Sequence, residues 1–553
     1  MDTFIKYRPA VLCLLPTAIC LLLFSCGSPE KESDKKFFRY NESGEITKLD
    51  PASANRTENI WAVNQMFNGL VQLDDNLQVI PCIAKSWGIS DSGRVYTFHL
   101  RNDVYFHDHP LFTNGKGRKV VAQDFVLSFF RLMDMDDEQS AKYLFSNIAR
   151  DERSDNLGFI APDDTTFMIF LSEPFPPFLN ILTMQYCSVI PNEIVEHYGP
   201  EFRSHPVGTG PFMFKAWQEG ERLVLVKNEN YFEKDADGTR LPYLDGITVN
   251  FIKDKQNAFI DFEKGDADML SGADMVNIDL IIDKEGKLKP EYQGKFTMQT
   301  GPYLKTDYLG FLVDEDSTIV KKSALRIKEV REAIGYAIDR DKIVQHLRNG
   351  IGTSATQGFV PKGMPSFDPV LQGFTYDPDR SRELLVKAGF PGGKGIEELT
   401  LHVTEQYLEL SQFIEHELEE VGIPVKIFLN RPIVQIEVIA NAQVNFFRKS
   451  WVADYADAEN FFACFYSKNF SPKGPNYTHF KNKDFDALFE QALKESDNTK
   501  RFELYKKMDK ILLNEAPMVP LFYDQVFRLV SNNIEGFALN PMNLLNLKRV
   551  KKK

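Results

Sequence analysis

The segment from Asn445 to Phe462 combines charged and aromatic side chains at a spacing suited to binding a small charged molecule. Its first part reads as a strand, and Arg448, Trp451 and Asp454 follow one another at three-residue intervals. A cation and an anion on either side of an aromatic wall could hold a carboxylate at one end and an amine at the other. The alternative is structural, because the two charges could lie on the surface or pair with each other, and Trp451 could be core. Taken alone, the segment favours the structural alternative.

A second candidate for chemistry is a metal site at His107-Asp108-His109. On a strand the two histidines would point to the same face, because side chains alternate along a strand. No third or fourth ligand follows nearby, and a polar loop accounts for these residues equally well. The pattern therefore favours a loop, and we predict no metal site and no cofactor.

Motifs of enzymatic chemistry are not recognisable in the chain. It has no Gly-x-Ser-x-Gly elbow, no Walker-type phosphate loop, no His-Glu-x-x-His and no Gly-x-Gly-x-x-Gly. Carboxylate pairs abound in a chain of pI about 5.4, so their presence does not indicate a glycosidase. The sequence thus favours a binding protein over an enzyme.

The N-terminus has the layout of a secretion signal. Two basic residues, Lys6 and Arg8, precede an apolar run from Val11 to Phe24 that is too short to be a convincing membrane span. The chain turns polar directly after Cys26, and Leu-Phe-Ser-Cys resembles a bacterial lipoprotein box, in which the cysteine is acylated and becomes the new N-terminus. A cysteine that carries more than one acyl chain is anchored stably. An ordinary cleaved signal with an incidental cysteine is the alternative.

We therefore predict a lipoprotein signal peptide over residues 1–25 and a flexible tether over residues 26–36. The protein is then expected outside the cytoplasm, on the periplasmic or cell-surface side of a bacterial membrane, with lipidated Cys26 as its anchor. Gly27 and Ser28 leave open which membrane carries it.

Composition restricts the function further. Removing the first 25 residues takes away two positive charges and one negative charge, which leaves 528 residues with a net charge of −14. Such an acidic chain lacks the basic surface that a nucleic-acid binder needs, and its length predicts two or three domains. Besides Cys26, the mature chain has Cys82, Cys187 and Cys464, so one disulfide with one free thiol and three buried thiols are both possible.

Hydrophobic periodicity predicts a mixed α/β protein around these candidates. Two strands separated by a Gln-Glu-Gly turn indicate a hairpin, and period-3.6 patterns indicate helices in the second half of the chain. The predicted strands are 96–100, 212–217, 223–227 and 518–523, and the predicted helices cover 330–338, 485–493 and 504–512.

An ordered series of short motifs carries a family resemblance. The motifs are Leu49–Pro51, Met66–Leu70, Pro81–Trp87, Tyr96–Arg101, Ala122–Val126, Gly208–Phe212, Val330–Arg340, Ala388–Pro391 and Trp451–Tyr455. Each motif is weak alone, but over residues 37–545 the series resembles the bacterial extracellular solute-binding proteins of family 5. These are the dipeptide- and oligopeptide-binding proteins of ABC importers.

The resemblance implies an α/β, two-lobed periplasmic-binding-protein fold of class II, of the large peptide-binder type, with a third accessory domain. The domains are then discontinuous and joined by a hinge, and the lobes close around the ligand. The expected boundaries are 37–67, 188–304 and 521–546 for lobe I, 68–187 for the accessory domain, and 305–520 for lobe II.

The resemblance also implies roles for the candidate residues. In the peptide binders, the residue matching Asp454 pairs with the ligand α-amine. The backbone at Ser450 and Val452 pairs with the peptide main chain as an added strand. Arg448 helps to hold the carboxylate in some members.

Further ligand contacts are expected from Trp451 and Tyr455, and from an opposing strand around Asn55 to Thr57. Three departures from the family pattern stand out. Asn55, followed by Arg56, replaces an acidic residue that supports the amine in some members. Gln406 and Tyr407 stand where some oligopeptide binders use a histidine for the carboxylate. Gly115–Lys119 belongs to a longer, basic stretch that replaces the usual Asp-Gly-x-Pro. The amine end of the site is thus better supported than the carboxylate end.

The sequence as a whole predicts a substrate-binding lipoprotein, monomeric, that captures peptides and delivers them to an ABC permease with its ATPase subunits. One alternative is the same fold binding a nickel chelate, haem, a sugar or an opine. Others are an extracytoplasmic hydrolase and a surface lipoprotein that only makes protein contacts.

Overall fold

The computed structural model of the chain describes residues 35–135, 141–150, 158–272 and 278–553. The predicted signal peptide, Cys26 and nearly all of the predicted tether lie outside the described residues. Among the residues that are described, no helix combines the length and apolar character needed to span a bilayer.

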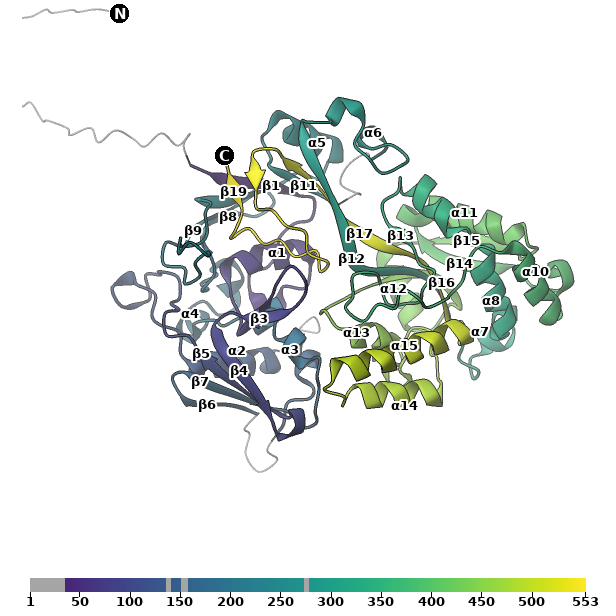
Figure 1. The fold of residues 1–553 in the computed structure, drawn as a ribbon, viewed down its shortest axis with the longest axis horizontal. Helices are drawn as coiled ribbons and strands as arrows, with labels where there is room; N and C mark the ends of the chain where they lie inside the picture. The colour runs from purple at the N-terminus through teal and green to yellow at the C-terminus, as the bar shows by residue number, and fades with distance from the viewer. Residues whose placement is uncertain (1–34, 136–140, 151–157, 273–277) are drawn as a thin grey trace, which may run out of the picture.

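One mixed sheet of eleven strands extends through both halves of the molecule (Figure 1). Its first five strands in spatial order are β15 (Val425–Asn430), β14 (Leu399–Thr404), β16 (Phe446–Val452), β12 (Phe296–Phe311) and β17 (Met518–Ser531). The order continues with β11 (Met269–Ser271), β1 (Phe37–Glu42), β10 (Gly246–Phe251), β9 (Arg222–Lys227) and β8 (Phe212–Gln218), while β13 (Thr353–Ser354) pairs with β17. The hairpin predicted from the sequence is confirmed as β8 and β9.

Two long strands, β12 and β17, connect the two lobes. They pair antiparallel on both sides of an irregularity between Pro302 and Thr306, where three residues of β12 lie opposite Asp524 alone. An interrupted ladder weakens local pairing and bends the strands, so this is where the connection can flex. The predicted boundaries between lobes I and II, near residues 304 and 520, fall within these two strands.

The accessory region has its own four-stranded antiparallel sheet, in the order β4 (Ala84–Ser90), β5 (Val95–Leu100), β7 (Thr166–Phe170) and β6 (Phe159–Asp163). Helix α2 (Ala122–Asp134) covers this sheet with Phe125 and Phe129, which contact Phe167 at ring distances of 5.7 and 5.6 Å. A short hairpin of β2 (Val71–Leu73) and β3 (Val79–Pro81) precedes the sheet. The strand predicted at residues 96–100 is confirmed.

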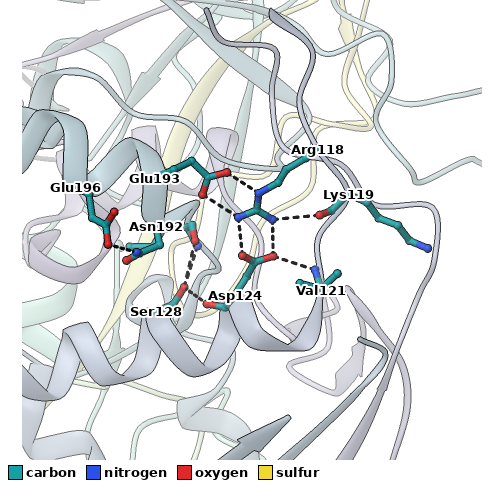
Figure 2. A network of polar contacts seen from close by, with 9 residues as sticks. Arg118, Lys119, Val121, Asp124, Ser128, Asn192, Glu193 and Glu196 are labelled. Carbon is teal, nitrogen blue, oxygen red and sulfur yellow. Dashed lines mark hydrogen bonds and ion pairs between the residues drawn. The ribbon is translucent and has the colours of Figure 1, made fainter. Parts of the chain in front are cut away.

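Within the basic stretch Gly115–Lys119, the side chain of Arg118 holds two helices together (Figure 2). The Arg118 guanidinium donates to both carboxylate oxygens of Asp124 in α2, at 2.9 and 2.7 Å, and to Glu193 in α4 (Asn192–Tyr198) at 2.8 Å. Asp124 also accepts from the Val121 N–H at the start of α2. The departure from the family pattern at this stretch is therefore a clamp between α2 and α4.

In lobe II, helices cover both faces of the sheet. Side chains alternate along each strand, so neighbouring apolar residues point to opposite faces and each face needs a covering layer. Phe446 packs in one core with α8 (Lys328–Ala337), α10 (Pro378–Lys387) and α11 (Leu408–Glu419). Phe447 packs in the other core with α13 (Glu459–Phe462), α14 (Lys483–Ala492) and α15 (Asn498–Glu515). The three predicted helices and the strand from Met518 are thus confirmed.

The described residues also form the following helices and strands. They are α1 (Thr57–Met66), α3 (Phe178–Ile181), α5 (Lys255–Lys264), α6 (Ile278–Ile281), α7 (Thr318–Lys321), α9 (Arg340–Lys342), α12 (Pro432–Ala440), β18 (Ile534–Glu535) and β19 (Lys551–Lys552).

The cysteines of the described residues resolve an alternative that the sequence left open. Cys82, Cys187 and Cys464 are all free thiols and all buried. Burial raises the pKa of Cys82 to about 12, so this thiol stays protonated at neutral pH.

Candidate functional site

The register of β16 decides which of its backbone groups are available to a ligand. Ala453 N–H donates to Leu304 O at 2.9 Å, and Leu312 N–H donates to Asn445 O at 3.2 Å. In an antiparallel pair the hydrogen-bonding residues alternate, so the odd-numbered residues of this segment bond to β12. The N–H and C=O groups of Ser450 and Val452 therefore point to the opposite edge of β16.

That opposite edge is only partly covered. Strand β14 runs parallel to β16 and pairs with it at His402 and Phe447, and β14 ends at Thr404. Beyond this point no strand of the described residues pairs with the edge at Ser450 and Val452. An extended peptide could add to this edge through main-chain hydrogen bonds.

Asp454 lies just beyond the end of β16, and Asn460 fixes its position. Asn460 Oδ1 accepts from Trp451 Nε1 at 3.0 Å and from the Asp454 N–H at 3.1 Å. Asn460 Nδ2 in turn donates to Asp454 Oδ2 at 3.3 Å. The Asp457 carboxylate accepts from the N–H of Glu459, the first residue of α13, and so marks the start of that helix. One asparagine thus ties the aromatic wall to the carboxylate.

The Asp454 carboxylate is accessible to water but has protein on most sides. Crowding by protein raises its pKa, and the hydrogen bond from Asn460 opposes this effect. Among the described residues it forms no ion pair, so its charge is not neutralised. Burial raises the pKa of Tyr186 to about 12, and Asp454 contributes to that shift, as it does to the raised pKa of Tyr143. Both tyrosines belong to the predicted accessory domain, so Asp454 lies near that domain as well as at the end of β16.

The segment after Asp50-Pro51 reaches the same region, but not as a strand. Thr57 is the first residue of α1, and Asn55 precedes the helix without belonging to a strand. The expected opposing strand at Asn55 to Thr57 is therefore wrong. Gln185 Nε2 donates to Ala54 O at 2.7 Å, which holds this loop beside Tyr186. Asn55 and Thr57 are exposed there, and their contact with a ligand remains a prediction.

Arg448 lies on the other face of β16 from Trp451, and its partner is Asp307 of β12. Arg448 Nε donates to Asp307 Oδ1 at 2.7 Å, and a second hydrogen bond joins Nη2 to Oδ2. Both side chains are nearly inaccessible, and the guanidinium carbon lies 3.2 Å from the centre of the Tyr407 ring. Arg448 therefore pairs with Asp307 and not with Asp454. Its charge is already balanced in this state.

A second set of charges lies on the same face as Arg448. Asp524 accepts from Lys305 at 2.7 Å and from Arg348 at 2.5 Å. Burial would raise the pKa of Asp524, but the two cations hold it below its ordinary range. These residues line a cavity of about 240 Å³ with Asp307 and Tyr407. Lys305 and Arg348 share Asp524. Together with the Arg448–Asp307 pair they form a cluster of three cations and two acids, which carries one excess positive charge.

Tyr455 is buried, and its hydroxyl donates to Glu459. Burial raises the pKa of Glu459 to about 7, and the hydrogen bond from Tyr455 opposes that shift. The Tyr455 ring belongs to the hydrophobic core of lobe I and the accessory region, although the residue comes from the lobe II segment. Its position indicates a contact between the two halves beside Asp454.

The histidine candidates have structural partners. His107 is buried, and one ring nitrogen lies 2.9 Å from Gly210 O while the other accepts from Gly208 N–H at 3.3 Å. Burial lowers its pKa to about 4, so the ring is neutral near pH 7. His109 contacts Tyr198. Within the described ranges no three metal-ligating side chains come together.

Sequence reasoning missed several residues of the site because their partners are far apart in the chain. Asp307 and Arg448 are 141 residues apart, and Lys305 and Asp524 are 219 apart. Asn460 is the exception, since its place in the first turn after Asp457 is a local signal.

Two α/β lobes are joined by crossing strands, and a free strand edge and unbalanced charges lie between the lobes. Together, these features define the class of solute-binding proteins that close on a ligand. The profile of the bacterial extracellular solute-binding proteins, family 5 (middle region), matches residues 78–473. The chain belongs to this family, whose members are substrate-binding proteins of ABC transporters and not enzymes.

Relatives with known names agree with that assignment. The dipeptide-binding protein of Escherichia coli K12 is 26% identical over 496 residues, covering 86% of this chain and 87% of its own. The glutathione-binding protein of Escherichia coli O6:K15:H31 is 28% identical over 502 residues, covering 90% of each chain.

Solved structures show the same fold. HbpA2 from Haemophilus parasuis superposes with a TM-score of 0.79 at 22% identity, covering 94% of this chain and all of its own. DppA from Helicobacter pylori in complex with the peptide STSA gives 0.74 at 24% identity, with 94% and 99% coverage. The fold class predicted from the sequence, a two-lobed periplasmic-binding-protein fold of the large peptide-binder type, is confirmed.

Proposed function

We propose that this protein captures peptides between its two lobes and delivers them to an ABC permease. The observation that carries the proposal is the un-neutralised carboxylate of Asp454 at the end of a strand edge whose backbone groups at Ser450 and Val452 face outward. A peptide supplies what each feature lacks, since its α-ammonium pairs with Asp454 and its main chain adds to the edge. Trp451, Tyr455, Asn55 and Thr57 complete the walls of the site.

The carboxylate end of the peptide would meet the charged cluster on the Arg448 face. Arg448 alone offers no free charge, because Asp307 balances it. The excess positive charge comes from Lys305 and Arg348, which share Asp524. We propose that the three cations and two acids act as one cluster that attracts a carboxylate.

Closure would occur at the irregular pairing of β12 with β17. Bending there brings Tyr143 and Tyr186 towards Asp454 and excludes water from the amine site. The names of the relatives, a dipeptide- and a glutathione-binding protein, support a peptide as the ligand.

The decisive experiment is native mass spectrometry of the protein purified from its own host, followed by calorimetry with the ligand found. A co-purifying peptide that binds with a 1:1 stoichiometry supports the proposal. A co-purifying nickel chelate, haem, sugar or opine in the absence of any peptide binding contradicts it. Turnover of an ester or peptide panel would revive the hydrolase alternative, and the absence of any small-ligand thermal shift would favour a role in protein contacts.

We also propose that Cys26 is lipidated, that residues 27–36 tether a monomeric binding protein to its membrane, and that this raises its concentration near the permease. Cys26→Ser should move the protein from the membrane fraction to the soluble extracytoplasmic fraction. An unchanged distribution would contradict the anchor. Light scattering of the purified protein tests the monomer.

A further inference from the structure

Lys449 is the one charged residue of β16 whose charge is not balanced by an acid in the described part of the chain. It follows Arg448 in sequence and therefore points to the opposite face, the face of Trp451. Its ammonium lies 4.2 Å from the centre of the Tyr477 ring, and it forms no hydrogen bond or ion pair with any described residue.

The surroundings of Lys449 are apolar and aromatic. Its cross-strand neighbour is Tyr308, and the same face holds Trp451, Tyr477 and the buried thiol of Cys464. Crowding by these groups lowers the pKa of Lys449, and Arg448 adds to that effect, while Cys464 opposes it. A cation over one aromatic ring, partly removed from water and without a counterion, is a preformed site for an anion.

The two faces of β16 differ in this respect. On one face each cation has an acid close by, as Arg448 has Asp307. On the other face Lys449 has only the Tyr477 ring. Burial raises the pKa of Tyr477, and Cys464 and Asp454 add to that shift, so the ring that contacts Lys449 is also near the amine site.

We propose that Lys449 forms a side-chain subsite that selects peptides with an acidic residue. The proposal rests on the proposed function, because it needs a peptide added to the free edge of β16. Side chains of such a peptide alternate between the two faces, and only those on the Trp451 face approach Lys449. The peptide N-terminus lies near Val452 in the proposed site, and Lys449 is three residues from Val452, about 10 Å along the strand. The acidic residue therefore lies two or three positions after the N-terminal residue of the peptide, as its third or fourth residue.

The test uses calorimetry with four pairs of tetra-alanine peptides, the members of each pair differing only by Glu or Gln at one of the four positions. The wild-type protein should bind the Glu peptide about tenfold more tightly, or better, at a position facing Lys449, and show little preference at the neighbouring position. In Lys449→Met this preference should vanish, while affinity for the Gln peptide stays within about threefold. Lys449→Arg should retain the preference. Lys483→Met removes the same charge from an exposed position and should change nothing.

Three results would overturn the subsite: no position prefers Glu, the preference survives in Lys449→Met, or that variant weakens Glu and Gln peptides equally. These outcomes leave peptide binding itself intact. Failure of every peptide to bind the wild type would instead refute the proposed function, and the subsite with it.

Discussion

Replacing Asp454 with asparagine tests the centre of the proposed site. The variant keeps the shape of the side chain and removes its charge. Asp454 has one weak hydrogen bond, from Asn460 at 3.3 Å, and no ion pair among the described residues. The fold therefore gains little from this charge, and the raised pKa shows that folding disfavours it. Thermal unfolding of the variant should be unchanged or slightly improved.

Ligand binding should respond very differently. Losing one side of a desolvated charge pair costs about 2–5 kcal/mol, which is a loss of about 30-fold to several thousand-fold in affinity. Calorimetry near pH 7 with a peptide that binds the wild type measures this loss. The matched control is Asp484→Asn, which removes the same charge from an exposed position in α14 and should bind normally.

An N-acetylated peptide completes the experiment. Acetylation removes the ammonium from the ligand side, so it should weaken wild-type binding by about as much as Asp454→Asn does. In the variant, acetylation should cost little more, because the partner is already gone. Affinity of the wild type should also fall as the pH drops towards the raised pKa of Asp454, and this fall should be absent in the variant. Unchanged affinity in Asp454→Asn, or equal binding of free and acetylated peptides, would refute the reasoning.

Three further predictions concern charges that support the fold. Asp307→Asn leaves Arg448 buried without its acid and should cost about 3–5 kcal/mol in the free energy of unfolding, whereas replacing both residues with apolar ones should restore most of it; equal stability of the single and double variants in urea would argue against the pair. Glu42 has its pKa raised to about 8 by burial and by Glu58, while Arg528 opposes the shift. Because an unfolded glutamate is ionised well below pH 6.5, raising the pH from 6.5 to 8 should remove about 1.5 kcal/mol of stability that Glu42→Gln keeps; identical pH profiles of the two proteins would contradict this. Arg118→Met should lower the free energy of unfolding by about 1–3 kcal/mol, which is less than for a fully buried pair because Arg118 is one-third exposed. Peptide affinity should be unchanged, and Arg118→Lys should have an intermediate stability. A stability loss no larger than that of Lys116→Met would show that the clamp has little energetic role.

Local patterns of the sequence predicted three helices of lobe II and the strands that begin near Phe446 and at Met518. The helix around Val330 and the two helices before Pro517 follow from a period of 3.6 residues, which depends only on neighbours in the chain. Local patterns did not predict the structure of the segment after Asp50-Pro51. The family resemblance implied a strand there, whereas Thr57 begins α1, and only the direction of that loop brings it near Tyr186.

In the candidate site, too, the sequence indicated residue types but not the contacts between distant residues. Residue types alone singled out Arg448, Trp451 and Asp454, and the family resemblance then assigned Asp454 to the ligand amine and Arg448 to its carboxylate. Neither source indicated the partner of Arg448, Asp307, which reaches it from a strand 141 residues earlier. No spacing rule links two residues whose contact depends on how two strands align.

What the sequence by itself determined was the class: the ordered series of motifs carried the resemblance to the family 5 solute-binding proteins, and the N-terminal pattern predicted an anchored, extracytoplasmic protein. What only the tertiary structure decided was which groups remain available to a ligand. The register of β16 against β12 turns the backbone of Ser450 and Val452 outward and pairs Arg448 with Asp307. Asp454 and Lys449 are left without an ion pair among the described residues. These outcomes depend on side chains brought together from distant parts of the chain, and a shift of one residue in register would exchange the two faces.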